Sequence, residues 1–380
     1  MACVLVSCDS RERQARLLLE EKGVAVSLAA LHEAAAAGEA DLIEALVVEG
    51  VPVDEVDASG QTALMKAAEA GQVPALRVLL EHSQGVHAED VAGGSALSRA
   101  VERGDLVAAS LLLERGASPL GRDGQGTPLL VNALREGNLA LFFRLMEAAG
   151  EIESAFFSEL VPEAVKAGQV AALREFQKQG VDLSADGTGY PQGLPHLALS
   201  ADKPRVLDFL LSEGLDVTQR DEAGDGLIHA AVSRSATELI PLLKRHGVDL
   251  DGRNAEGLRA VHLALWQQDY DSLQALLREG ARVDLPSRGE LPLDAAVRAR
   301  DYAAARLLLR YGAPRGNLLY QAVGMEGRDG REFFDLALEF RASPNPAMTP
   351  WLDTPLNLAL RRGKLDMARK LLQAGALSAA

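Results

Sequence analysis

Apolar residues recur along this chain with a helical period, in short blocks separated by glycine-bearing turns. One block runs from Leu64 to Gly71, a second from Leu76 to Leu80, and a turn follows. Apolar positions three and four residues apart are typical of an amphipathic helix. The pattern predicts two short helices per unit. Because helices of about ten residues are marginal in isolation, each unit must bury its apolar face against its neighbours.

The pair of helices repeats at an interval close to 33 residues. Each first helix carries a leucine-like position, and a glycine or polar residue follows it seven residues later. The second helix often carries a Leu-Leu pair and commonly stops at Gly-Ala or Gly-Val, where glycine can adopt the left-handed cap. This repetition predicts an all-α repeat solenoid. The leucine-like positions define eleven units, at Leu31, Leu64, Leu97, Leu130, Val161, Pro195, Ile228, Val261, Leu293, Leu319 and Leu356.

Several units share a motif at the turn that leads into the first helix. Asp57-Ala58-Ser59-Gly60-Gln61-Thr62-Ala63-Leu64 is one copy, and later copies contain Gly126-Thr127-Pro128-Leu129, Ile228-His229-Ala230-Ala231 and Thr354-Pro355-Leu356. The motif resembles the ankyrin repeat, whose pattern is Asp-x-x-Gly-x-Thr-Pro-Leu-His-x-Ala-Ala-x-x-Gly. The resemblance covers residues 28–380 and implies a stack of paired antiparallel helices joined by short hairpin loops.

Two regions depart from the motif, near residues 151–195 and 316–350. In the first, phenylalanines replace the hairpin signature, and a Gly/Pro loop runs from Gly187 to Pro195. In the second, the stretch 324–330 looks inserted. We expect the stack to bend or loosen there without forming separate domains. Residues 1–27 are a separate N-terminal segment, in which 17–23 looks like a lone second helix that caps the stack.

Composition narrows the functional classes. The chain has 380 residues, of which 48% are hydrophobic, and its net charge is −15. This balance excludes wholesale disorder. No stretch approaches the roughly 20 apolar residues of a membrane-spanning helix, and no block of like charge suggests a nucleic-acid tail. We therefore expect neither a transmembrane segment nor a nucleic-acid partner. Cys3 and Cys8 are the only cysteines, so disulfides cannot hold the fold together.

Candidates for catalysis or metal binding are weak. His82 and His87 straddle a glycine turn without ligand-like spacing. The acidic loop 221–226 lacks the glutamate that a calcium loop needs at its twelfth position, which is Val232. The glycine-rich stretch 121–126 lacks the lysine and hydroxyl of a phosphate-binding loop. No catalytic residue, metal or cofactor is expected, and the chain is predicted not to be an enzyme.

Four histidines occupy the Leu-His slot of the motif, at His32, His196, His229 and His262. The last three are spaced by 33 residues. A histidine recurring at the repeat interval indicates a structural role, so we interpret these side chains as hydrogen-bonding partners that tie one repeat to the next.

The resemblance also implies where a partner docks. Ankyrin proteins usually bind on their concave side, formed by the hairpin tips and by the two residues after Ala-Ala on the first helix. The helix positions carry seven basic and three acidic side chains, whereas the tips are mainly acidic. We therefore expect a mixed-charge protein or peptide partner. The predicted contact residues are Glu69, Glu102, Arg103, Arg135, Glu136, Lys166, Arg234, Trp266, Gln267, Arg298, Arg361 and Arg362 on the helices, with Asp186, Glu222, Asp225, Glu256, Arg288 and Glu290 at the tips.

Trp266 is the strongest single candidate, because its slot faces the expected binding side and an exposed tryptophan is costly unless something covers it. The alternative is that it packs against Tyr270 or the next unit. A second aromatic group lies in the irregular middle of the chain. We interpret it as core filling, with an apolar docking patch as the alternative; its members are Phe142, Phe143, Phe156, Phe157 and Phe176.

The N-terminus suggests a different possibility. Leu5-Val6-Ser7-Cys8 resembles a bacterial lipobox, in which the cysteine becomes the lipid-bearing first residue after signal cleavage. Only seven residues precede Cys8, so this interpretation requires a translation start upstream of Met1. For the chain as written, the expected location is cytoplasmic. A membrane tether in the bacterial cell envelope is expected only if Cys8 is lipidated.

Three functional hypotheses follow. The leading one is a non-enzymatic scaffold, expected to be monomeric, that binds a protein or peptide on its concave face. The second is an envelope-anchored lipoprotein with a structural or accessory role. The third is an enzyme whose site the sequence does not reveal. Repeat scaffolds carry unrelated functions, so the sequence does not identify the partner.

Overall fold

The computed structural model describes residues 2–184, 193–345 and 354–376, with side chains from residue 11 onward. The described residues form α-helices and no β-strand, apart from isolated bridges within the hairpins. The all-α prediction is therefore confirmed. The chain divides into two compact units, Met1–Gly189 and Tyr190–Ala380, which we call the N-terminal unit and the C-terminal unit.

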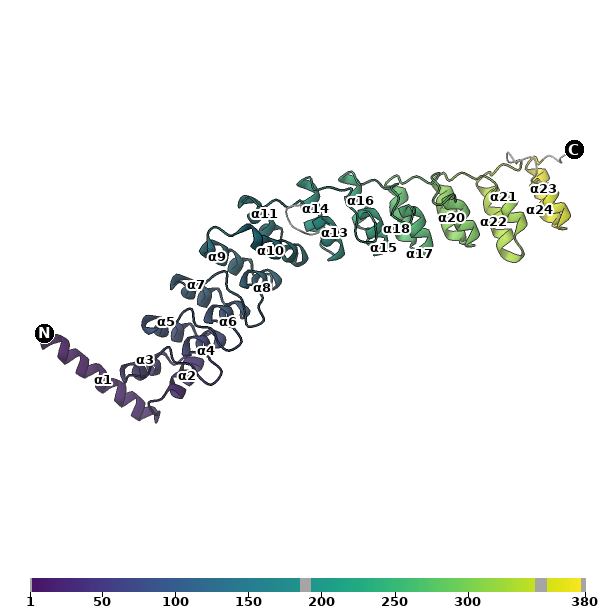
Figure 1. The fold of residues 1–380 in the computed structure, drawn as a ribbon. Helices are drawn as coiled ribbons and strands as arrows, with labels where there is room; N and C mark the ends of the chain where they lie inside the picture. The colour runs from purple at the N-terminus through teal and green to yellow at the C-terminus, as the bar shows by residue number, and fades with distance from the viewer. Residues whose placement is uncertain (1, 185–192, 346–353, 377–380) are drawn as a thin grey trace. The chain divides into compact units, whose positions relative to one another are not determined.

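In the N-terminal unit, a long first helix precedes a series of helix pairs (Figure 1). The helices are α1 (Ala2–Lys22), α2 (Leu28–Ala37), α3 (Ala40–Val48), α4 (Ala63–Ala70), α5 (Val73–His82), α6 (Ala96–Glu102), α7 (Leu106–Glu114), α8 (Leu129–Arg135), α9 (Leu139–Ala149), α10 (Ser154–Ala167) and α11 (Val170–Lys178).

The C-terminal unit continues the same two-helix arrangement. Its described helices are α13 (Gly193–Ser200), α14 (Pro204–Ser212), α15 (Leu227–Ser233), α16 (Leu239–Arg245), α17 (Ala260–Gln267), α18 (Tyr270–Arg278), α19 (Pro292–Arg298), α20 (Tyr302–Arg310), α21 (Leu318–Gly324), α22 (Gly327–Glu339), α23 (Pro355–Arg361) and α24 (Leu365–Gln373).

Local sequence explains where the first helices begin and end. The Thr62 side chain accepts a hydrogen bond from the backbone N–H of Met65 at 3.3 Å and caps α4. At the other end, Gly71 has φ 72°, which only glycine adopts without strain. Gly38 ends α2 in the same way, with φ 81°. The glycines that recur every 33 residues are therefore helix terminators.

The core lies between successive helix pairs. First helices pack on first helices, as in α2, α4 and α6, and second helices pack on second helices, as in α3, α5 and α7. Leu31, Leu64, Leu97 and Leu130 are each at most 2% exposed. Burying one leucine stabilises the fold by about 1.5–3 kcal/mol, so the repeating apolar slot is the main source of cohesion between repeats.

Helix α1 packs against α3, with Ala15 and Leu19 buried and Leu17 exposed. The helix α3 is the second helix of its pair. Helix α1 therefore contacts a second helix, which is the contact expected of the lone second helix predicted within residues 17–23. The proposed boundary at residue 27 and the capping role stay predictions.

The phenylalanines of the irregular middle fill the core of the N-terminal unit. Phe142, Phe157 and Phe176 are at most 5% exposed. The Phe176 ring meets Phe142 and Phe157 edge to face, with centroid distances of 5.8 and 5.3 Å. Core filling is confirmed for these three rings. The docking-patch alternative is wrong for them, because no partner can reach a buried ring.

The second irregular region is helical. The stretch that looks inserted ends α21 at Gly324 and begins α22 at Gly327, and α22 has 13 residues against 9 in α20. A Cβ on Gly330 would lie 2.7 Å from the Met325 carbonyl oxygen, so this glycine permits a close approach of the backbone. The extra residues therefore lengthen a second helix. In the other irregular region, residues 185–192, including Asp186 and Tyr190, lie outside the described part of the chain.

Candidate partner-binding groove

The histidines of the Leu-His slot connect each first helix to the following hairpin. All four rings are buried. Each Nε2 atom lies within hydrogen-bonding distance of a carbonyl oxygen, and because a carbonyl only accepts, Nε2 must carry the proton. The prediction that these histidines tie one repeat to the next is confirmed. The pairs are His32 with Glu55 at 3.3 Å, His196 with Asp225 at 3.2 Å, His229 with Leu258 at 3.1 Å and His262 with Glu290 at 2.9 Å.

His262 is held at both ring nitrogens. Its Nδ1 lies 2.9 Å from the Ser287 hydroxyl, which also accepts a hydrogen bond from the Arg259 backbone N–H at 3.1 Å. With Nε2 donating to Glu290, Nδ1 accepts from the hydroxyl. Burial lowers the pKa of His262, as it does the pKa of His229. His262 is therefore a neutral strut between helix α17 and the hairpin that follows it.

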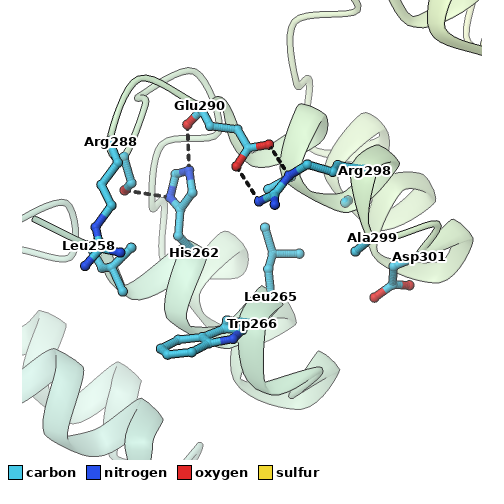
Figure 2. Close-up of a pocket in the computed structure, with 12 residues that line it drawn as sticks. Leu258, His262, Leu265, Trp266, Arg288, Glu290, Arg298, Ala299 and Asp301 are labelled. Carbon is cyan, nitrogen blue, oxygen red and sulfur yellow. Dashed lines mark hydrogen bonds and ion pairs between the residues drawn. The ribbon is translucent and has the colours of Figure 1, made fainter. Parts of the chain in front are cut away.

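That hairpin carries charged side chains above the end of α17. The Glu290 carboxylate accepts two hydrogen bonds from the Arg298 guanidinium, at 2.8 Å from Nε and 2.7 Å from Nη2 (Figure 2). Arg288 donates from Nη2 to the Glu256 carboxylate at 3.0 Å and from Nε to the Glu256 carbonyl at 2.8 Å. Two ion pairs thus form one rim of a groove between successive repeats.

The floor of this groove is apolar. The groove has a volume of about 390 Å³. Its apolar side chains come from α17 and α19 and include Leu265, Trp266, Ala295 and Ala299. We call it the Trp266 groove. Trp266 follows His262 by four residues, one turn along the same helix, so the strut that fixes the hairpin also sets the rim over the indole (Figure 2).

Trp266 is 74% exposed. Among the described residues it forms no ring–ring contact, and Tyr270 instead donates its hydroxyl hydrogen bond to Asp301 at 3.0 Å. Two causes raise the pKa of Tyr270: partial burial of the hydroxyl is the larger, and its hydrogen bond to Asp301 is the second. The alternative in which Trp266 is covered by Tyr270 or by the next repeat is wrong, because three quarters of the side chain faces solvent.

Several predicted contact arginines also have a structural role. Arg103, Arg234 and Arg362 donate to carbonyl oxygens near the end of the preceding first helix, at 3.4 Å from Glu69, 2.9 Å from Ser200 and 2.6 Å from Gly324. A cation at a helix C-terminus compensates the unpaired carbonyl groups there. These guanidinium groups therefore join adjacent repeats while their side chains stay on the surface.

The other predicted helix residues lie on or directly after first helices, some in the N-terminal unit and some in the C-terminal unit. Arg135 and Lys166 share the Glu163 carboxylate, at 2.7 and 2.9 Å. The remaining members are exposed and do not line the Trp266 groove; they are Glu69, Glu102, Glu136, Gln267 and Arg361.

The acidic tips are partly used within the fold. The Asp225 carboxylate accepts a hydrogen bond from the Asn254 side chain at 2.8 Å, so it links neighbouring hairpins. Glu222 is exposed, and Glu256 pairs with Arg288. Asp186 lies outside the described residues.

Other candidate chemistry finds little support in the described residues. His82 contacts Glu44 at 3.1 Å, and no group of three or more ligand side chains there could hold a metal ion. In the same part of the chain, no helix combines the length and apolar character needed to cross a membrane. Cys8 falls within α1, but its side chain is outside the described part, so its lipidation stays a prediction.

Sequence reasoning missed several groove residues, among them Leu258, Leu265, Ser287 and Asp301. Asp301 is the N-cap of α20, accepting a hydrogen bond from the Ala304 backbone N–H at 3.0 Å. The missing step was to consider the residue that precedes each second helix. That position holds Asp, Asn or Gln in several repeats, and the sequence shows them at the repeat interval. The interval alone does not show which of these residues faces a groove.

Comparison with known proteins agrees with the geometry. The family model for ankyrin repeats, which contains three copies of the repeat, matches residues 31–123, 195–287 and 228–318, together more than half of the chain. The matches leave out residues 124–194, which contain α8 to α11, and residues 319–380, which contain nearly all of α21 and the whole of α22, α23 and α24. A search of the curated proteins finds no match. Ankyrin repeats are in general protein–protein interaction modules and typically non-enzymatic scaffolds. From the repeat motif, the paired helices and the family match, we conclude that the chain belongs to the ankyrin repeat family.

Proposed function

We propose that this chain is a non-enzymatic scaffold that binds a protein or peptide partner on the face formed by its hairpins and first helices, with the Trp266 groove as the centre. The observation that carries the proposal is the exposure of Trp266, 74%, on the apolar floor of a groove. Tryptophan is enriched among the residues that dominate binding energy, and those residues sit in pockets that the partner fills.

The free energy available from this one side chain is substantial. A tryptophan side chain buries up to about 250 Å², so covering the exposed three quarters of Trp266 contributes about 4–5 kcal/mol before ordering costs, at about 25 cal/mol per Å². The quarter that is already buried contributes only about 1–2 kcal/mol to folding by the same arithmetic. Loss of the indole should therefore affect binding much more than stability.

The charges of the groove favour a protein partner over a polyanion. Arg298 is paired with Glu290 and Arg288 with Glu256, so the guanidinium groups at the rim are already neutralised. A phosphate backbone binds through unpaired Lys and Arg side chains, which release its counterions. The neutralised rim offers little of that attraction.

A scaffold role also agrees with the state of His262. Both ring nitrogens are occupied by hydrogen bonds, and burial lowers the pKa of the ring. General acid–base catalysis needs a nitrogen that can reach substrate. His262 is instead committed to holding the hairpin.

The test is affinity capture from the native source with the wild-type chain and Trp266→Ala side by side, followed by mass spectrometry. Tyr311→Ala is the matched control, since Tyr311 is an exposed aromatic residue, 37%, outside the groove. Thermal unfolding followed by circular dichroism checks that all three proteins are folded.

We expect a stoichiometric protein that Trp266→Ala fails to retain and that Tyr311→Ala retains. Loss of the indole should weaken binding at least about 30-fold, which corresponds to about 2 kcal/mol. Retention of the same proteins by all three baits would refute the assignment of the groove.

A further inference from the structure

The charged side chains that line the Trp266 groove do not all cancel. They are Arg288, Glu290, Arg298 and Asp301. Glu290 and Arg298 form a bidentate pair at 2.7 and 2.8 Å, and bidentate geometry is the strongest form of this ion pair. Arg288 is compensated by Glu256 from the preceding hairpin, at 3.0 Å. The carboxylate of Asp301 is the charge that is left.

Among the residues that the structure describes, Asp301 accepts side-chain hydrogen bonds from neutral donors only. One oxygen accepts from the Ala304 backbone N–H and the other from the Tyr270 hydroxyl, each at 3.0 Å. Within the described part of the chain, no Lys or Arg forms an ion pair with it. The adjacent cation, Arg300, is paired with Asp329 at 2.9 Å. The half-buried carboxylate of Asp301 is therefore not paired with a cation of the described chain, at the α20 side of the groove.

The indole adds a second preference for positive charge. The face of tryptophan is the most favourable aromatic surface for a Lys or Arg cation. Trp266 is exposed, and Leu265 and Ala299 extend the apolar surface beside it. An occupant that satisfies the whole groove therefore combines an aliphatic stem with a positively charged end. An acidic side chain would instead meet the uncompensated carboxylate of Asp301.

We propose that the partner inserts an arginine or lysine side chain into the Trp266 groove, with its stem over the indole and its charged end toward Asp301. This inference rests on the proposed function, because it names the chemistry of the partner at the same site. The recognition element is then a basic residue within a peptide segment, and the exclusion of acidic segments supplies part of the specificity.

The probe for this inference is a phage-displayed random dodecapeptide library, selected against the full-length wild-type chain. Enriched peptides are synthesised, and their affinities are measured by fluorescence polarisation against the wild type, Trp266→Ala and Asp301→Asn. Asparagine is also a good N-cap: its oxygen can accept from the Ala304 backbone N–H, and its NH2 group can donate to the Tyr270 oxygen in place of the second carboxylate oxygen. Asp301→Asn therefore removes the charge while keeping a hydrogen bond at both places.

Asp105→Asn is the matched control. Asp105 is the N-cap of α7, where its side chain accepts from the Val107 and Ala108 backbone N–H groups at 3.0 Å, and it does not line the groove. The substitution removes one negative charge from the same kind of position in another repeat. A second control replaces each enriched arginine of the peptide with citrulline, which keeps its shape and removes its charge.

We expect enrichment of peptides that contain arginine or lysine and bind through Trp266. Asp301→Asn and the citrulline replacement should each weaken them about tenfold, as expected for a partly desolvated charge pair, whereas Asp105→Asn should leave affinity within about twofold. Peptides that depend on Trp266 but lack basic residues, or are insensitive to Asp301→Asn, would overturn this inference and leave the proposed function intact. Failure to select any peptide that depends on Trp266 would overturn both.

Discussion

The hydroxyl of Ser287 is a small group on which the rim of the Trp266 groove depends. Ser287 is 2% exposed; its Oγ donates to His262 Nδ1 at 2.9 Å and accepts from the Arg259 backbone N–H at 3.1 Å. Its backbone forms two further hydrogen bonds with Glu290, each 2.9 Å long. The substitution Ser287→Ala leaves the backbone bonds in place and deletes both bonds of the hydroxyl.

The magnitude follows from the two groups left behind. A buried donor or acceptor that loses its partner costs about 1–3 kcal/mol. The Arg259 N–H and His262 Nδ1 both lose theirs, which gives a loss of about 2–6 kcal/mol from the unfolding free energy of this part of the chain. We expect the lower half of this range, because the fold already contains a histidine in the same slot without this bond. The Nδ1 atom of His229 is buried and has no hydrogen-bond partner in the described structure.

Repeat arrays open in segments, so the assay must be local. Hydrogen-exchange mass spectrometry of the full-length chain reports the opening free energy of the peptides that contain the 287–290 hairpin and α19. We expect these peptides to lose protection in Ser287→Ala, and peptides from the N-terminal unit to keep theirs. Affinity for a ligand that depends on Trp266 should fall as well, because the hairpin carries Arg288 and Glu290 over the groove.

The control is Ser212→Ala. Ser212 is exposed and its hydroxyl donates to the Phe209 carbonyl at 2.7 Å within the same helix, so removing it should cost less than about 0.5 kcal/mol. If Ser287→Ala changes hairpin protection no more than Ser212→Ala does, the hydroxyl does not hold the rim. The account of His262 as a strut would then be refuted.

Two further predictions concern the core. Burial lowers the pKa of His229 and His262, so below about pH 6.5 the unfolded chain binds more protons than the folded chain. The unfolding free energy of the C-terminal unit should therefore decrease as pH falls below 6.5; urea unfolding between pH 8 and 5 that shows no decrease, or an increase, would contradict this. Phe176→Ala should destabilise the N-terminal unit by about 3–5 kcal/mol, because a buried ring between Phe142 and Phe157 is replaced by a cavity; the same urea assay measures it, and a loss below about 1 kcal/mol would show that the aromatic core repacks.

The structural role of the histidines was predictable because it depends on the repeat. A side chain that recurs at the repeat interval meets the same neighbour each time, so His196, His229 and His262 all reach a carbonyl in the following hairpin. The stretch 324–330 was harder to interpret. The change in spacing indicates extra residues, but whether they form a loop or lengthen α22 depends on how closely Gly330 approaches the end of α21.

The arginines show that the charge of a surface cannot be predicted from helix positions alone. Counting side chains on the helix slots indicates a basic surface, yet Arg298 is neutralised by Glu290 and Arg103 donates to a carbonyl of the preceding repeat. Those partners lie eight and thirty-four residues away in the chain. Asp301, which no positional rule singled out, carries the charge that remains in the groove.

The sequence by itself determined the helical repeat, its terminating glycines, its buried leucines and the slot of Trp266, because each depends on contacts that recur with the same neighbours in every repeat. Only the tertiary structure decided that Trp266 is uncovered, that the rim charges cancel in pairs and that Asp301 faces the same groove. These features depend on side chains from different repeats meeting in space. A periodic pattern specifies which positions face one another, but not which of the individual residues there remain without a partner.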